Sequence, residues 1–246
     1  MNKIQFCRFF ILAFFIFIWE FSARMGLIDT FIMSSPYRIL GVLINNDILF
    51  HIWVTTRSTI IGFVLGVSLG LLISWILWLS PFLSRVFAPF LVVLNALPKI
   101  ALGPVIIIWV GPGESAIITM ALAISLVVTI LEMLNGFVNT DKELIKMLRT
   151  FGAGKNQIFW RIVMPYNKPT LFASLKINIG LSLVGVIAGE FLVSRAGLGY
   201  LIVYGGQVFQ MDLVMASVVI LAFLAAILYL FICLLEWFFN RGKHET

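Results

Sequence analysis

Six apolar runs, each close to the roughly 20 residues that a helix needs to cross a bilayer, divide this chain of 246 residues. They cover residues 6–21, 52–79, 86–110, 115–138, 171–193 and 213–239. Hydrophobic residues make up 61% of the chain and charged residues only 11%, against a usual charged share of about 25%. A soluble domain of this size could not cover so much apolar surface. The sequence therefore predicts an all-α, polytopic membrane protein with six transmembrane helices.

The third run differs from the others because Pro98, Gly103 and Pro104 interrupt it. A break of this kind is tolerated in a membrane only where the freed backbone groups face protein or a wet cavity. We therefore expect a short, broken or re-entrant helix, and Asn95, Pro98 and Lys99 become candidates to line a translocation path. Lys99 could attract an anionic solute there, or extend its ammonium group to the membrane interface.

The basic residues are unevenly distributed along the chain. Six of the 17 Lys and Arg residues lie in the connection 139–168, which the positive-inside rule places in the cytoplasm. Both termini are then cytoplasmic, and the first run is an uncleaved helix because no small-residue cleavage site follows it. The net charge of +6 thus reflects membrane topology and contact with membrane lipid, and not nucleic-acid binding.

Glycines recur at helical spacing in two of the runs. Gly62, Gly66 and Gly70 follow one another every four residues, and Gly185 and Gly189 repeat the pattern. Such stripes let another backbone approach closely. One interpretation is that the close neighbour is a helix of the same chain. The other is that the stripes form a subunit interface or a hinge at which helices slide.

Acidic residues within apolar runs are expensive and are functional candidates by default. Glu132 and Glu190 lie in the fourth and fifth runs, and each serves either in translocation or gating or as a structural hydrogen-bond partner. Glu20 and Glu236 lie near the ends of their runs, where we expect them at the membrane interface.

The cytoplasmic connection has the pattern of a helix-turn-helix. Thr140 and Glu143 have capping-box spacing, and apolar residues then recur at helical spacing up to Gly152 and Gly154, which can end a helix in a left-handed cap. A second apolar stretch leads to Pro165, which breaks the helix. The helix pair either lies on the membrane surface among anionic lipids or docks on a cytoplasmic partner, and we favour docking.

The run LRTFGAGKNQIFWRIVMP resembles the cytoplasmic signature of the permease subunits of bacterial ABC importers. That signature reads Glu-Ala-Ala, three residues, Gly, nine residues, then Ile, any residue, Leu and Pro. Here the glycine is Gly152, and the closing positions are Ile162, Met164 and Pro165 at the same spacing. The opening triplet falls on Lys146, Met147 and Leu148, so Glu-Ala-Ala itself is absent.

Two further stretches, LPKIALGPVIIIWVGPGE and GEFLVSRAGLGYLI, are similar to segments of permeases for sulfonates, taurine, nitrate and related solutes. Together the similarities cover about residues 50–240. The resemblance implies a single permease domain over residues 1–246, with the type I ABC importer fold and a coupling-helix loop at 140–165. It also implies a small organic or oxyanionic substrate such as a sulfonate, taurine, nitrate or a vitamin precursor.

The same resemblance implies partners and a place in the cell. Two copies would pair as a homodimer in the bacterial inner membrane, each docking an ATP-binding subunit, while an extracytoplasmic solute-binding protein delivers substrate. The coupling helix would cover approximately residues 146–158. The residues that it implies for ATPase coupling are Lys146, Leu148, Arg149, Thr150, Phe151, Gly152, Ala153 and Gly154.

The sequence offers little for chemistry of its own. It contains no phosphate-binding loop of the Gly-x-x-x-x-Gly-Lys-Ser/Thr type, no spacing of histidines or cysteines typical of a metal site, and no evident nucleophile–base pair. We therefore expect no cofactor and no enzymatic activity, so that energy for transport comes from another chain. An ion-coupled transporter or channel that uses Glu132 and Glu190, and an intramembrane enzyme, are the alternatives.

Overall fold

The computed structural model describes the backbone of residues 3–45 and 48–241, and their side chains except at 3–6, 8, 9, 12, 43–45, 240 and 241. Every regular element in these ranges is helical. The elements are α1 (Lys3–Arg24), α2 (Thr30–Met33), α3 (Pro36–Asn45), α4 (Ile48–Leu79), α5 (Pro81–Ala96), η1 (Lys99–Leu102), α6 (Gly103–Val110), α7 (Glu114–Val138), α8 (Lys142–Thr150), α9 (Lys155–Ile158), η2 (Phe159–Val163), α10 (Met164–Tyr166), α11 (Lys168–Val193), α12 (Leu198–Gln207) and α13 (Met211–Arg241).

Four helices of the described part are long and apolar enough to cross a membrane, namely α4, α7, α11 and α13. The pair formed by α5 and η1–α6 gives a fifth span if it is counted as one. The all-helical fold is therefore confirmed, and four or five of the six expected spans correspond to helices that are long and apolar enough to cross a membrane. The first expected span, residues 6–21, falls in α1, where several side chains lie outside the described residues.

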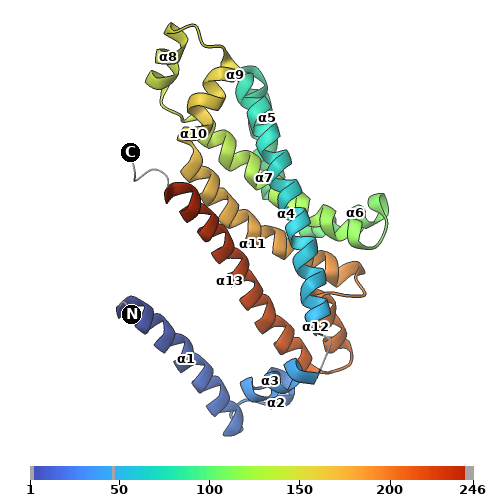
Figure 1. Ribbon diagram of the computed structural model, residues 1–246. Helices are drawn as coiled ribbons and strands as arrows, with labels where there is room; N and C mark the ends of the chain where they lie inside the picture. Colours follow the sequence, from blue (N-terminus) through green and yellow to red (C-terminus); the bar gives the residue numbers. More distant parts are fainter. Residues whose placement is uncertain (1–2, 46–47, 242–246) are drawn as a thin grey trace.

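The long helices form a bundle with two distinct ends (Figure 1). The loop end carries α8 and α9, beside the last turn of α4 and the first turn of α5. The opposite end, called here the α12 end, carries α2, α3 and α12. The short helix α6 projects sideways from the bundle, and α1 stands apart from α13 (Figure 1).

The glycine stripe of α4 packs against α7. A Cβ atom added at Gly70 would lie 2.6 Å from Cβ of Thr129, and one at Gly66 would collide with the hydroxyl of Ser125. Gly62 faces Ala121 in the same way. The two helix axes therefore approach closely because one side carries no side chains, and the contact lies within one chain.

The stripe of α11 packs against the same helix. A Cβ at Gly185 would lie 2.6 Å from Cα of Ala121, and one at Gly189 would lie 2.9 Å from Cα of Ile117. The helix α7 is thus held between two glycine-lined surfaces. Of the two interpretations of the stripes, packing inside the subunit is the one that the structure supports.

The third run is broken, as its prolines predict. The helix α5 ends at Ala96, and the chain turns by 85° before η1 and α6 continue. Nζ of Lys99 donates to the carbonyl oxygen of Asn95 over 3.2 Å. Lys99 and Asn95 therefore lie together at the bend, where the ammonium satisfies a carbonyl group near the end of α5.

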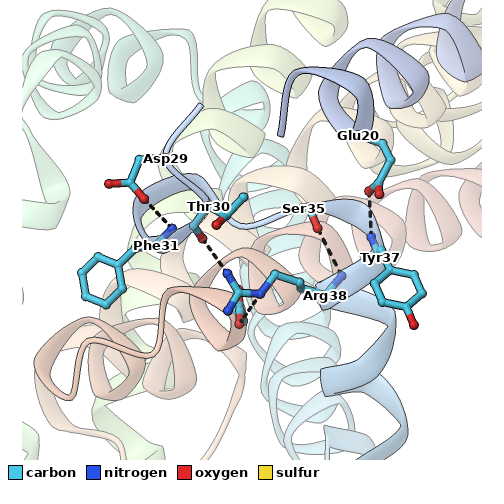
Figure 2. Close-up of polar contacts among 8 residues, drawn as sticks. Glu20, Asp29, Thr30, Phe31, Ser35, Tyr37 and Arg38 are labelled. Carbon is cyan, nitrogen blue, oxygen red and sulfur yellow. Dashed lines mark hydrogen bonds and ion pairs between the residues drawn. The ribbon is translucent and has the colours of Figure 1, made fainter. Parts of the chain in front are cut away.

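Polar contacts join α1 to the rest of the chain at the α12 end (Figure 2). The carboxylate of Glu20 accepts the backbone N–H of Tyr37 over 3.1 Å and the Nε–H of Arg24 over 2.7 Å. Arg38 in turn donates to the carbonyl of Thr30 and forms an ion pair with Asp212 at 3.3 Å. The first helix is thereby linked through α3 to the start of α13.

Candidate functional site

The loop between α7 and α11 contains two short helices joined by a tight turn. The side chain of Asp141 accepts the backbone N–H of Glu143 over 2.8 Å and caps α8, so the expected cap at Thr140 was wrong by one residue. At the other end, the N–H of Ala153 donates to the carbonyl of Leu148, and Gly152 adopts a φ of +78°. The left-handed cap expected at Gly152 is confirmed.

Gly154 has a different role from the one expected. Its φ is −72°, and it lies at the N-terminus of α9. The segment 146–158 is consequently the second half of α8, a turn at 151–154 and the helix α9, and not one continuous helix. Phe151, the aromatic residue of the turn, is 81% exposed. The tip of the loop therefore presents apolar surface that nothing in the described chain covers.

Two buried side chains fasten the base of the loop. Nδ2 of Asn167 donates to Oγ1 of Thr140 and to the carbonyl oxygen of Val163, both over 2.8 Å. Thr140 is 1% exposed and Asn167 3% exposed. The contact ties the chain just after α7 to the chain just before α11, so the loop leaves the bundle from a fixed base.

Aromatic rings connect the second half of the loop to the bundle. Phe159 begins the π-helical turn η2 and packs on Phe137 of α7 and Trp78 of α4, at centroid distances of 5.0 and 5.4 Å. Nε1 of Trp78 donates to the carbonyl of Phe137 over 3.1 Å. The start of η2 is therefore packed against both α4 and α7.

A buried carboxylate organises the α12 end. Glu190, near the end of α11, is 1% exposed. It accepts Oγ1–H of Thr55 over 2.8 Å and the backbone N–H of Gly199 over 2.7 Å. Oγ1 of Thr55 also accepts the N–H of Leu198 over 2.8 Å. The carboxylate thus lies at the N-terminus of α12 and accepts one of the N–H groups that have no partner within that helix.

A second contact from α4 supports the same short helix. The N–H of Gly197, which has a φ of +113°, donates to Nδ1 of His51 over 3.0 Å. The imidazole ring of His51 also stacks on Tyr200 with a centroid distance of 6.1 Å. The sequence identifies Glu190 as a candidate residue but neither Thr55 nor His51, because nothing in the sequence around these two residues marks them as partners of α12.

The other candidate residues do not join this cluster. Glu132 is 18 residues beyond Glu114 along α7, or about 27 Å of helix, toward the loop end. Its Oε2 atom is buried and has no hydrogen-bond partner among the described residues. Asn95, Pro98 and Lys99 lie at the bend after α5. The candidates for translocation or gating therefore occupy separate places in the fold.

One ion pair between two candidate membrane-spanning helices was missed. Nζ of Lys176 in α11 lies 2.5 Å from Oε2 of Glu236 in α13. A lysine in one apolar run and a glutamate in another are the signal that could have suggested it, because charges at membrane depth are stable mainly as pairs.

These features define a class of protein: a polytopic helical membrane protein. At one end it carries an apolar-tipped loop that is hydrogen-bonded at its base, and at the other a short helix held by buried polar contacts. The chain belongs to the family of binding-protein-dependent transport system inner membrane components, whose model matches residues 59–243. Family members are permease components of ABC transporters. They work with an ATP-binding subunit and a substrate-binding protein.

Curated relatives agree with the family. The chain is 28% identical to a "Probable ABC transporter permease protein" of Haemophilus influenzae, over 91% of each chain. It is 30% identical to the formylaminopyrimidine transport permease protein ThiX of Halalkalibacterium halodurans, over 74% of each. It is 24% identical to the taurine transport system permease protein TauC of Escherichia coli, over 89% of this chain and 83% of the relative. The resemblance inferred from the loop motif is therefore confirmed.

Proposed function

We propose that the chain is the translocation subunit of a type I ABC importer, a single permease domain with six spans that acts as a homodimer in the bacterial inner membrane. The loop end and both termini then face the cytoplasm. The observation that carries this proposal is the α8–α9 loop, whose tip exposes Phe151 while its base is fixed by Asn167 and Thr140. A loop built in this way can receive force from a partner without folding back.

In this proposal the tip of the loop enters a groove of the ATP-binding subunit. Phe151 and Gly152 seat the turn, and the other residues implied for coupling surround them: Lys146, Leu148, Arg149, Thr150, Ala153 and Gly154. When ATP closes the ATPase dimer, the loop moves and η2 carries the movement to Trp78 and Phe137. The bundle then exchanges between inward-facing and outward-facing states.

The α12 end would form the extracytoplasmic side of the path. There the Glu190–Thr55 contact fixes α12 against α4 and α11, and α12 lies where a binding protein would deliver its solute. Asn95, Pro98 and Lys99, at the bend after α5, are proposed to line the path. The proposed substrate is a small organic or oxyanionic solute, namely a sulfonate such as taurine, nitrate, or a vitamin precursor of the formylaminopyrimidine kind.

The test of coupling is a substitution at the exposed tip. Phe151→Asp should fold normally, because the ring is 81% exposed, yet it should abolish co-purification of the ATP-binding subunit. Phe31→Asp, at a ring that is 58% exposed at the α12 end, is the matched control and should leave co-purification intact. A Phe151→Asp permease that retains its ATPase and transports solute at the normal rate would contradict the proposed docking.

A second candidate function rests on Glu132, whose buried Oε2 atom has no partner among the described residues. An ion-coupled transporter could use such a group as an ion site. Reconstituted transport that depends on an ion gradient, continues without ATP and is lost in Glu132→Gln would favour this alternative. Transport that requires ATP and survives Glu132→Gln would exclude it.

A further inference from the structure

A basic cavity lies at the loop end, between the bundle and the coupling loop. It has a volume of about 470 Å³ and is bounded by the last turn of α4, the first turn of α5, and the helices α8 and α9. No acidic side chain of the described residues lines it. Five basic side chains do, namely Arg85, Lys142, Lys146, Arg149 and Lys155. Its size falls within the range of roughly 300–1,000 Å³ that is usual for small-molecule sites.

The helix α8 turns one face toward this cavity. Lys142, Ile145, Lys146 and Arg149 follow one another at the spacing of a single helix face. Met147, which lies outside this row, is 48% exposed. The basic face of α8 therefore points to the ends of α4 and α5, so Lys146 and Arg149, which are also proposed for ATPase coupling, face this cavity. Phe151 at the tip remains exposed for a protein partner.

The charges in the cavity are not compensated by the chain. Nζ of Lys155 donates to the carbonyl of Leu79 over 3.1 Å, and Nε of Arg85 donates to the carbonyl of Pro81 over 3.2 Å. These contacts satisfy donors but cancel no charge. Lys142, Lys146 and Arg149 form no ion pair within the part of the chain that the structure describes. Five like charges around one cavity repel one another, and an anion would relieve that repulsion.

The position of the cavity indicates which anion fits. It opens where the apolar span α4 ends, at Trp78 and Leu79, and tryptophan is enriched at the membrane–water interface. Apolar side chains form the remainder of the wall, including Val138 and Ile145. A ligand with a negative head group and a hydrocarbon body would match both parts of this surface, and phospholipid head groups lie at this depth.

We propose that the cavity binds the phosphate of an anionic phospholipid, which bridges α8 to the ends of α4 and α5. The role of this lipid goes beyond transport and ATPase docking. By neutralising the basic face of α8, the lipid holds the loop close to the bundle in the position from which it couples. Basic pockets between transmembrane helices are known to bind phospholipid head groups in this way.

The test uses the transporter purified from membranes in mild detergent and measures retained phosphatidylglycerol by native mass spectrometry. Arg85→Gln and Lys142→Gln remove cavity charges outside the set proposed for ATPase coupling. Each should lower lipid occupancy about fivefold, as expected for one basic residue near an anionic surface, and the double variant should lower it further. Lys168→Gln removes a charge at the start of α11, outside the cavity, and should leave occupancy unchanged.

Three outcomes would overturn the proposal. The first is equal retention of phosphatidylglycerol by the wild type and the double variant, and the second is an equal loss of lipid in Lys168→Gln. The third is displacement of the lipid by millimolar inorganic phosphate, which would assign the cavity to a soluble anion. Because the readout is bound lipid and not transport, a failure here is distinguishable from a failure of the proposed function.

Discussion

The hydroxyl of Thr55 donates a 2.8 Å hydrogen bond to the carboxylate of Glu190, although the two residues are 135 positions apart in the sequence. The same hydroxyl oxygen accepts the N–H of Leu198. One threonine side chain thus satisfies a buried acceptor on α11 and a buried donor on α12 at once. The α12 helix is thus attached to α4 through Thr55 and through His51.

Thr55→Val is expected to loosen the α12 end. The substitution keeps the shape of the side chain but leaves the N–H of Leu198 unpaired and Glu190 with one donor fewer, at a cost of about 1–3 kcal/mol for a buried unsatisfied group. The thermal unfolding midpoint in detergent should fall, and residues 194–212 should become more accessible to protease. Thr56→Val is the control, because Oγ1 of Thr56 bonds only within its own helix, to Ile52. Equal behaviour of the two variants would contradict the assigned role of Thr55.

Gly70→Ala should destabilise the bundle. The added Cβ would lie 2.6 Å from Cβ of Thr129, and overpacking of this kind costs about 1–3 kcal/mol. Gly180→Ala offers a matched comparison, since a Cβ there meets nothing within 4 Å and alanine favours helix by about 0.5–1 kcal/mol. The unfolding midpoints should move in opposite directions. A lower midpoint in both would point to glycine contacts with a second subunit.

Gly152→Val should disturb the coupling loop more than Gly154→Val does. A Cβ atom added at either position meets no neighbour within 4 Å, but Gly152 has a φ of +78° and Gly154 one of −72°. The left-handed conformation costs an ordinary residue about 1–2 kcal/mol, so the turn at Gly152 should open. The measurement is solute-stimulated ATPase activity of the assembled transporter in proteoliposomes. Full stimulation in Gly152→Val would show that the turn geometry is unimportant for coupling.

Removing one partner of the Lys176–Glu236 pair should be worse than removing both. Each of Lys176→Met and Glu236→Leu leaves an isolated charge at the interface of α11 and α13, whereas the double variant replaces the pair by apolar groups. We therefore expect the unfolding midpoint of the double variant to exceed that of either single variant. Additive losses in the double variant would indicate that the two residues act independently.

The sequence predicts those parts of this fold that depend on contiguous patterns. The apolar runs locate α4, α7, α11 and α13 to within a few residues, and Pro98 and Pro104 predict the bend after α5. The loop motif identifies Gly152 and the family. Each of these signals lies within one segment, so no knowledge of helix rotation was needed.

The contacts between segments could not be predicted in the same way. The partner of Glu190 depends on how α4 and α11 are rotated about their axes. The sequence does not determine this rotation, because polar residues occur on several sides of each apolar run. Asn167 and Thr140 are neighbours only because the loop closes on itself. The cap moved from Thr140 to Asp141 because both residues carry a suitable side chain, and the backbone geometry chose between them.

The π-helical turn η2 has a consequence for comparing this chain with its relatives. Such a turn accommodates one residue more than an α-helix of the same length, between Phe159 and Val163. A relative that lacks one residue in this segment could therefore continue α9 as a regular α-helix up to the turn at Asn167, where α10 ends. If such a relative were aligned with this chain without a gap here, each loop residue before this segment would be matched to a residue on a different helix face.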